Sequence, residues 1–466
     1  MASTDVLSIA HQLASRFLAG VANRHVGGRV SPQQLRASLG GPLPIAGTDP
    51  ERVIQELFTG ADPGVVAQAG PRYFGFVTGG ALPVTVAADW LASAWDQNVT
   101  LYVHSPAAAT LEDVVAGWIL ELLHLPSTAS VGFTSGCHMA NFTGLAAARH
   151  EVLRRAGWDV ERQGLHQAPR VRVFAGNEVH VSVVGALRFL GFGADELELV
   201  AVDDQGRMRA DALRERMSGA TGPAIVCAQA GNVATGASDP IAEVVAVAHE
   251  RQAWVHVDGA FGLWAAAVPE MREQVRGLEG ADSWATDAHK WLNVPYDSGL
   301  VIVANAAAHR AAMSFKASYL QRGADEERTG MDWVPESSRR ARVIPLYALI
   351  KTLGRDGIAE MIRRNVKLAH RMADRLSRVP GVRILNEVVL NQVLVQFDGT
   401  RDRSADEITR AAMSEIQAEG TCWAGGAFWQ GKQVMRISIS NWSTSEADID
   451  RSAVAIAQCY RNVVQL

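Results

Sequence analysis

The chain is poor in the residues that mark several common classes of protein. It has four cysteines in 466 residues, Cys137, Cys227, Cys422 and Cys459, and no two of them form a CxxC pair. This spacing argues against structural zinc or another metal site, and the length of the chain makes a disulfide framework implausible. We therefore expect reduced thiols, which are typical of a cytoplasmic protein.

Basic tracts and long apolar runs are also absent from the sequence. The formal net charge is -5, so nothing suggests nucleic acid or an anionic membrane as a partner. No apolar run approaches membrane-spanning length, and residues 1–20 lack the basic-then-apolar pattern of a signal peptide. The sequence predicts a soluble, cytoplasmic protein.

A chain of 466 residues is too long for one ordinary hydrophobic core, and its pattern changes twice along its length. Residues 1–85 are typical of helices interrupted by Gly/Pro-rich stretches. Residues 86–345 alternate helical segments with short apolar runs, which predicts a large α/β domain with a doubly wound sheet. Residues 346–466 predict a smaller α+β domain that contains a helix with an apolar face over 358–376.

Five short runs rich in β-branched residues are predicted to be buried parallel strands of the large domain. They are residues 171–174, 197–202, 224–227, 254–257 and 300–303. A helix is expected at 240–252, because residues 238–240 (SDP) form a good helix start. Asp258 therefore stands at the carboxyl end of a strand, where sites form in open α/β sheets.

The most informative feature is a lysine that follows this aspartate by about thirty residues. Lys290 lies in residues 287–291 (DAHKW), and Asp258 lies in residues 257–260 (VDGA). An amine can hold the aldehyde of pyridoxal 5'-phosphate (PLP), and a carboxylate can keep its pyridine nitrogen protonated so that the ring withdraws electrons. The pair predicts a PLP enzyme in which Lys290 and Asp258 are catalytic residues.

Together with residues 293–299 (NVPYDSG), the lysine motif resembles that of the group II PLP-dependent amino-acid decarboxylases, relatives of the aromatic-L-amino-acid and glutamate decarboxylases. The matched segments run from about residue 70 to about 445. The resemblance implies PLP fold type I, the aspartate aminotransferase-like fold. It also implies a homodimer with active sites at the interface, where the segment of Tyr102 reaches the partner subunit's site.

The same resemblance implies roles for residues around the cofactor ring. Lys290 would be the Schiff-base residue, Asp258 would pair with the ring nitrogen, and Ala260 would pack on one ring face. His180, in residues 176–182 (GNEVHVS), would stack on the other face, with a ring nitrogen near the substrate carboxylate. Asn232 is either a hydrogen-bonding residue near the cofactor or an ordinary turn residue.

A second group of residues is expected at the cofactor phosphate. Residues 133–141 (FTSGCHMAN) lead into a helical run and match the family's phosphate loop in position. A glycine turn at a helix N-terminus is a ready phosphate site. Relatives usually have small and acidic residues where this chain has Cys137, His138 and Met139, but backbone amides would still bind phosphate. The expected cofactor-binding residues here are Gly136, Cys137, His138, Asp287 and His289.

On the substrate side, residues 72–80 (RYFGFVTGG) resemble a family segment that lines the substrate. The resemblance implies a wall formed by Phe76, Val77 and Thr78. Arg436 matches a family arginine of the small domain, which either binds a carboxylate or forms a structural salt bridge. Three aromatic residues, Phe76, Tyr102 and Trp423, mildly favour an aromatic amino acid as substrate.

The predicted reaction is decarboxylation of an L-amino acid to the amine and carbon dioxide, through an external aldimine and a quinonoid. Relatives often return the proton from a tyrosine on a mobile loop, but residues 321–337 contain no tyrosine. Gly330 falls near the expected place, and Tyr319 precedes the loop.

In relatives, loss of this tyrosine accompanies an oxygen-dependent route to an aldehyde. That reaction, or another PLP-dependent carbon–carbon lyase or transferase reaction, is therefore the alternative. A non-enzymatic scaffold would have little use for Lys290 and Asp258 together.

Overall fold

The computed structural model describes residues 4–219, 221–315 and 327–465. The chain divides into two compact units. One consists of Gly79–Ala369 and Asn386–Val393, and is called here the large unit. The other, the small unit, consists of Met1–Thr78, His370–Leu385 and Leu394–Leu466. The small unit thus joins the N-terminal residues to C-terminal ones, whereas the sequence pattern predicts a separate N-terminal segment that ends at residue 85.

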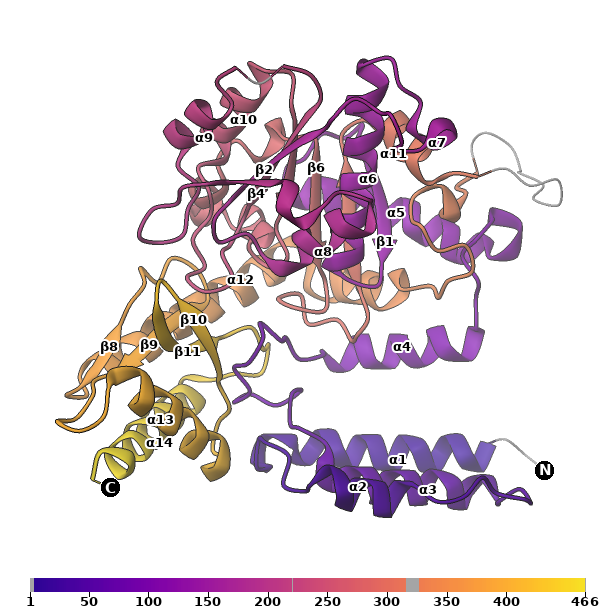
Figure 1. Ribbon diagram of the computed structural model, residues 1–466. Helices are drawn as coiled ribbons and strands as arrows, with labels where there is room; N and C mark the ends of the chain where they lie inside the picture. The colour runs from indigo at the N-terminus through magenta and orange to yellow at the C-terminus, as the bar shows by residue number, and fades with distance from the viewer. Residues whose placement is uncertain (1–3, 220, 316–326, 466) are drawn as a thin grey trace. The chain divides into compact units, whose positions relative to one another are not determined.

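The large unit is built on a seven-stranded sheet with strand order β1-β7-β6-β5-β4-β2-β3. Its strands are β1 (Ser130–Thr134), β2 (Arg172–Gly176), β3 (Leu197–Val200), β4 (Ala224–Gln229), β5 (Trp254–Asp258), β6 (Ser283–Asp287) and β7 (Gly299–Val303). Strands β3, β2, β4, β5 and β6 are parallel to one another. The predicted α/β fold with a mainly parallel sheet is confirmed (Figure 1).

One strand direction was predicted wrongly. The run 300–303 forms β7, but β7 is antiparallel to β6 and β1 is antiparallel to β7. The reason is the short return from β6, because residues 288–298 leave no room for the helical crossover that parallel neighbours require. This return contains Lys290, so the lysine lies on a tight connection at the carboxyl end of β6.

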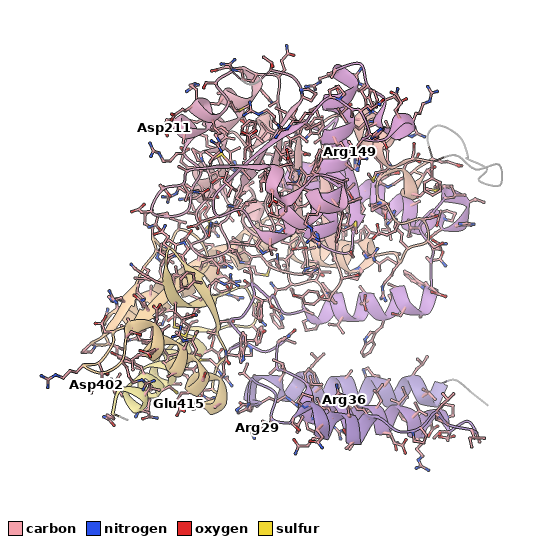
Figure 2. The ribbon with its side chains drawn as sticks, viewed as in Figure 1. Arg29, Arg36, Arg149, Asp211, Asp402 and Glu415 are labelled. Carbon is pink, nitrogen blue, oxygen red and sulfur yellow. The ribbon has the colours of Figure 1, made fainter. Side chains whose placement is uncertain are left out.

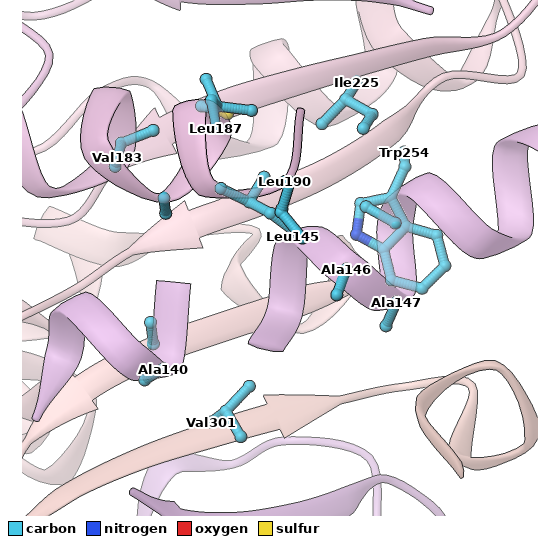
Figure 3. Close-up of a cluster of buried hydrophobic side chains, with 14 of the residues drawn as sticks. Ala140, Leu145, Ala146, Ala147, Val183, Leu187, Leu190, Ile225, Trp254 and Val301 are labelled. Carbon is cyan, nitrogen blue, oxygen red and sulfur yellow. The ribbon is translucent and has the colours of Figure 1, made fainter. Parts of the chain in front are cut away.

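Helices surround this sheet, and α6 covers the strands that carry the predicted site. The helices are α4 (Pro83–Trp95), α5 (Pro106–Leu123), α6 (Cys137–Arg155), α7 (Val160–Gln163), α8 (Val181–Phe189), α9 (Ala210–Arg216), α10 (Ile241–His249), α11 (Ala306–Met313) and α12 (Val343–Ser377), which continues into the small unit. Figure 3 shows the alanines of α6 beside Trp254 of β5 and Val301 of β7. Small side chains on α6 allow its backbone to lie close to the sheet.

The small unit combines helices with a four-stranded sheet of order β10-β11-β9-β8. Its elements are α1 (Thr4–Gly20), α2 (Pro32–Leu39), α3 (Pro50–Ala61), β8 (Val382–Ile384), β9 (Gln392–Phe397, which begins in the large unit), α13 (Ala405–Glu419), β10 (Gly425–Trp429), β11 (Lys432–Ser438) and α14 (Glu446–Gln465). The Asn441 amide donates to the carbonyls of Ala69 and Gly70, and Arg72 pairs with Asp448 at 3.2 Å. These bonds explain why the N-terminal residues belong to this unit.

Both units expose charged side chains. Charged side chains such as Asp211 of α9 and Asp402, before α13, are exposed (Figure 2). None of the helices in the described parts of the chain is long and apolar enough to cross a membrane.

Candidate active site

The turn that carries Lys290 is held by a glycine segment of the large unit. The amide of Gly80 donates to Asn293 Oδ1 at 2.7 Å, and the amide of Leu82 donates to the Asn293 carbonyl at 3.1 Å. A Cβ atom on Gly79 would lie 1.9 Å from the Lys290 carbonyl oxygen, so only glycine allows this approach. The glycines of residues 79–80 therefore fix the position of the lysine backbone.

The Lys290 ammonium is paired with Asp287. Lys290 Nζ lies 2.8 Å from Asp287 Oδ2, and the aspartate is almost fully buried. Burial, the largest single influence, disfavours the charged ammonium, but the charge and hydrogen bond of Asp287 together with the other acidic groups nearby outweigh it and raise the pKa of Lys290 to about 12. The other oxygen, Asp287 Oδ1, accepts the Cys137 amide at 2.6 Å. Asp287 thus joins the lysine to the first residue of α6.

His289 is held as a neutral ring beside the same carboxylate. The Ser298 amide donates to His289 Nδ1 at 3.1 Å, so Nδ1 is an acceptor and the ring proton lies on Nε2. Nε2 faces Asp287 Oδ1 at 3.3 Å, and the ring stacks on Tyr296 with centroids 4.3 Å apart. Burial lowers the pKa of His289, which agrees with the neutral form.

Asp258, at the end of β5, is a buried carboxylate surrounded by donors. Its Oδ1 accepts from the Ala260 amide at 3.2 Å and from the Cys137 thiol at 3.3 Å, and its Oδ2 accepts from the Asn141 amide at 3.2 Å. Burial and the charges of Asp258 and Asp287 raise the pKa of Cys137 well above its usual value, so the thiol stays protonated.

Asp258 is 4% exposed and forms no ion pair with any residue in the described part of the chain. A buried carboxylate without a cation is costly, and the site is therefore suited to receive a positively charged group.

The N-terminus of α6 offers free amides next to these residues. Gly136 caps the helix without a side-chain bond, and a Cβ atom there would lie 3.1 Å from His289 Cε1. Among the described residues, the amides of His138 and Met139 have no hydrogen-bond acceptor. Unpaired amides at a helix N-terminus bind phosphate well. The His138 ring itself stacks on Phe189 of α8 at 5.5 Å, so its side chain packs against that helix.

Two more predicted cofactor residues differ in their surroundings. His180 caps α8, and its Nδ1 accepts the Ser182 amide at 3.2 Å. A chain of hydrogen bonds through Ser182 and Asn141 links it to Asp258. Asn232 has the turn-residue contacts instead, because its Oδ1 accepts the amides of Ala234 and Thr235 and its Nδ2 donates to Glu178. No described contact joins Asn232 to the cluster around Asp258.

The predicted substrate residues belong to both units. Tyr102 opens a short 3-10 helix (Tyr102–His104) in the large unit, away from any described contact with the Lys290 cluster. Phe76, Val77 and Thr78 lie in the small unit, where Phe76 and Val77 have left-handed backbone angles. The Phe76 side chain is 64% exposed and lies 5.4 Å from the Trp423 ring.

The backbone of Arg436, on β11, pairs with β10, but its side chain forms no ion pair or hydrogen bond with a described residue. Of the two roles expected for it, the structural salt bridge is therefore not observed among the described residues.

Of the loop at residues 321–337, the structure describes residue 327 onward. Tyr319 and residues 321–326 lie outside the described residues. Gly330 is buried, and the amide of Met331 donates to the Thr100 carbonyl at 3.2 Å. Arg328 and Arg339 both pair with the buried Glu112. Ion pairs to Glu112 of α5 therefore hold this part of the chain on both sides of Gly330.

Taken together, the large unit supplies an amine on a fixed turn, a buried carboxylate that lacks a cation, and free amides at a helix N-terminus. These three features fit the aldehyde, the pyridinium nitrogen and the phosphate of PLP, and they define the class of a PLP-dependent enzyme with a type I fold. Residues 32–398 match the model of the pyridoxal-dependent decarboxylase conserved domain. The chain therefore belongs to this family, its cofactor is PLP, and it is an enzyme of the carboxy-lyase class.

Individual relatives cover nearly the whole chain. It is 25% identical to 4-hydroxyphenylacetaldehyde synthase of Rhodiola rosea, over 95% of this chain and 91% of the relative. It is 26% identical to aromatic-L-amino-acid decarboxylase of Bacillus atrophaeus, over 88% of this chain and 86% of the relative. A crystal structure of Oryza sativa TDC with PLP and tryptamine superposes with a TM-score of 0.92 at 25% identity, covering 100% of this chain and 99% of the other.

Sequence reasoning missed several polar residues that surround Asp258. In the sequence, Asn141 stands only at the end of the expected phosphate loop, and His256 only within an apolar strand. The signal was present in β5 (WVHVD), where Trp254, His256 and Asp258 alternate with valines and so point to one face of the sheet. Their partners, Asn141 and Ser283, lie far away in the sequence.

Proposed function

We propose that the protein decarboxylates an L-amino acid to the corresponding amine and carbon dioxide, as a homodimer. The buried Asp258, held by three donors and lacking a cation, is the observation that carries this proposal. PLP, when bound, supplies an electron-withdrawing ring that accepts the electrons of the broken carbon–carbon bond. Such a ring requires a protonated nitrogen, and an ionised carboxylate held in a dry site favours that proton.

Each residue of the cluster has a part in this reaction. Lys290 is the amine that carries the cofactor and later releases the product, and its turn is held by Gly79 and Gly80. The free amides of α6 receive the phosphate. Because His180 accepts a hydrogen bond at Nδ1, a neutral His180 bears its proton at Nε2. We assign to this proton the return step at the substrate carbon, in place of the missing loop tyrosine.

The substrate proposed is an aromatic L-amino acid. Support comes from relatives named as aromatic-L-amino-acid, tryptophan and tyrosine decarboxylases. Arg436 has no described partner, and burial lowers the pKa of its guanidinium. An arginine in this state is suited to bind a carboxylate.

A second reaction has specific support. Residues 321–337 contain no tyrosine, Gly330 falls near the place where the family resemblance implies one, and one relative is named as 4-hydroxyphenylacetaldehyde synthase. The second candidate function is therefore decarboxylation coupled to oxygen consumption, which yields an aldehyde.

The test combines spectroscopy with product analysis. Purified protein is incubated with PLP and a panel of L-amino acids, while absorbance, carbon dioxide and oxygen are followed together. We expect a visible cofactor band that Lys290→Ala abolishes and that Lys432→Ala, at the exposed first residue of β11, retains. Carbon dioxide with unchanged oxygen supports simple decarboxylation, and matched oxygen loss supports the aldehyde route. Absence of a band in the wild-type protein with added PLP would contradict both.

A further inference from the structure

A chain of polar contacts runs along β5 and ends at Asp258. Trp254 Nε1 donates to Ser283 Oγ at 2.8 Å, and Ser283 Oγ lies 2.8 Å from His256 Nδ1. His256 Nε2 lies 2.9 Å from Asn141 Oδ1, and Asn141 Nδ2 donates to Asp258 Oδ2 at 3.2 Å. The side chains of Trp254, His256, Ser283 and Asn141 are all almost fully buried. A buried chain of this kind is held in one arrangement only if every group has its partner.

The two ends of the chain fix the direction of every hydrogen bond in it. The Trp254 indole can only donate, and the ionised Asp258 can only accept. Asn141 must therefore turn its Nδ2 toward Asp258 and its Oδ1 toward His256. His256 Nε2 is then the donor, and His256 Nδ1 accepts the Ser283 hydroxyl proton. The arrangement requires a neutral His256 with its proton on Nε2, and burial lowers the pKa of this ring to about 4.

Asn141 is also a branch point. Its Nδ2 bears two hydrogens, and the second donates to Ser182 Oγ at 3.2 Å. Ser182 Oγ lies 2.7 Å from His180 Nδ1, which also accepts the Ser182 amide. The Ser182 hydroxyl therefore donates to Nδ1, and a neutral His180 carries its proton on Nε2. One amide group thus contacts Asp258 directly and His180 through a single hydroxyl.

The local backbone is adapted to this chain. A Cβ atom on Gly144, in the middle of α6, would lie 2.8 Å from His256 Cε1 and 3.0 Å from Nδ1. Glycine is unfavourable inside a helix, by about 1 kcal/mol relative to alanine, so its presence here is explained by the space that His256 needs. Figure 3 shows Trp254, at the far end of the chain, packed beside Ala146 and Ala147 of the same helix.

We propose that Asn141 is a positioning residue that sets two groups of the reaction at once, the ionised Asp258 carboxylate and the Nε2–H tautomer of His180. The inference deepens the proposed function and depends on its placement of Asp258 at the ring nitrogen and His180 at the ring face. The alternative is that Asn141 only fills space beneath α6. A purely structural role would change stability, but it would not change the protonation of the cofactor ring.

The first experiment needs no cofactor. Nitrogen-15 NMR of the histidine rings in PLP-free protein reports the tautomer of each ring, with signals assigned from His256→Gln and His180→Gln. We expect both rings to be neutral with the proton on Nε2. In Asn141→Leu, which has similar size and no polar atom, we expect the His256 resonances to shift. A proton on Nδ1 of either ring in the wild-type protein would overturn the proposal.

The second experiment uses the holoenzyme with PLP labelled at the pyridine nitrogen. In Asn141→Leu, loss of one charge-assisted bond to Asp258 is expected to weaken PLP binding by about 10- to 100-fold. The nitrogen resonance should shift toward the unprotonated form, and kcat should fall more than KM rises.

Ser182→Ala cuts only the branch to His180, so the nitrogen resonance should keep its wild-type position while kcat falls. Ser218→Ala, on the surface after α9, is the control for the procedure.

The outcomes separate this proposal from the proposed function. An unchanged nitrogen resonance and unchanged PLP affinity in a folded Asn141→Leu would overturn the positioning role while the decarboxylase remains. A wild-type protein that binds no PLP would overturn the proposed function, and the tautomers in PLP-free protein would still test the chain of hydrogen bonds. Thermal unfolding of each variant shows whether it is folded.

Discussion

Gly330 gives a sharp test of the idea that the loop tyrosine is missing for a structural reason. A Cβ atom at this position would lie 2.4 Å from the backbone carbonyl oxygen of Val99 and 2.4 Å from Arg339 Nη2. A backbone carbonyl has little freedom to withdraw, and Arg339 is held by the buried Glu112. Even alanine therefore requires the chain to shift, and a tyrosine ring requires far more.

The expected loss of unfolding free energy in the Gly330 variants follows from these contacts. Overpacking of a well-packed site costs about 1–3 kcal/mol, which is the expected loss in unfolding free energy for Gly330→Ala. For Gly330→Tyr, displacement of Arg339 would also leave Glu112 with one guanidinium fewer, and disruption of a buried ion pair costs about 3–5 kcal/mol. We expect Gly330→Tyr to destabilise the protein strongly and to leave the ratio of oxygen consumed to carbon dioxide released unchanged.

The assay is urea unfolding followed by tryptophan fluorescence, with a glycine in open space as the control. A Cβ atom on Gly117, inside α5, would meet nothing within 4 Å. Gly117→Ala should therefore stabilise the protein by up to about 1 kcal/mol. If Gly330→Ala were as stable as Gly117→Ala, the steric argument would be wrong. A well-folded Gly330→Tyr that stopped oxygen uptake would refute the inference that this position cannot host the tyrosine.

Three further predictions concern buried groups. Glu112→Gln should cost about 3–5 kcal/mol in urea unfolding, because it leaves Arg328 and Arg339 buried with a neutral partner. The four buried cysteines should not react with a thiol reagent in the native protein, and all four should react after unfolding. Burial lowers the pKa of His256 to about 4 and that of His309 to about 3 from an ordinary 6.5, so only the unfolded chain takes up these protons below pH 6.5. Stability should therefore fall as the pH drops below 6.5, by up to about 1.4 kcal/mol per pH unit for each histidine.

Each of these three predictions has a control variant or a result that would contradict it. Glu56→Gln removes the exposed pair with Arg52 and should cost less than about 1 kcal/mol. A cysteine that reacts rapidly in the native protein would contradict its buried position. Asp239, whose pKa burial raises to about 6, opposes the two histidines between pH 6 and its ordinary 3.8. Constant stability from pH 7 to pH 6 would contradict the histidine assignment, since Asp239 contributes little there.

The sequence predicted those parts of the fold whose signal is local. The runs around 171–174, 224–227 and 254–257 are apolar and β-branched, and all became buried parallel strands. The strands β1 (SVGFT) and β6 (SWATD) were not predicted, because polar and small residues break their apolar pattern although every residue in them is buried. The direction of β7 depends on the length of its connection to β6, which the composition of the strand does not reveal.

The residues of the candidate site likewise fall into those that a local sequence signal predicts and those that only the structure shows. Lys290 and Asp258 were predicted because each stands in a short, recognisable string. The contacts that determine their behaviour join distant residues: Cys137 to Asp287 across 150 positions and His256 to Asn141 across 115. No periodicity encodes such pairs, and a histidine between two valines looks like an ordinary core residue. The sequence shows that Cys137 departs from the family pattern, but only the structure shows that its thiol donates to Asp258.

Two aspartates at the ends of neighbouring strands thus have different environments and different consequences. Asp258, at the end of β5, faces only neutral donors, and its charge remains available for a cation from outside the protein. Asp287, at the end of β6, is committed to Lys290 and keeps that amine charged. Because only an uncharged amine attacks an aldehyde, the pairing with Asp287 opposes attachment of the cofactor until the ion pair opens. The same carboxyl end of the sheet therefore holds one carboxylate ready for the cofactor and another that restrains the lysine.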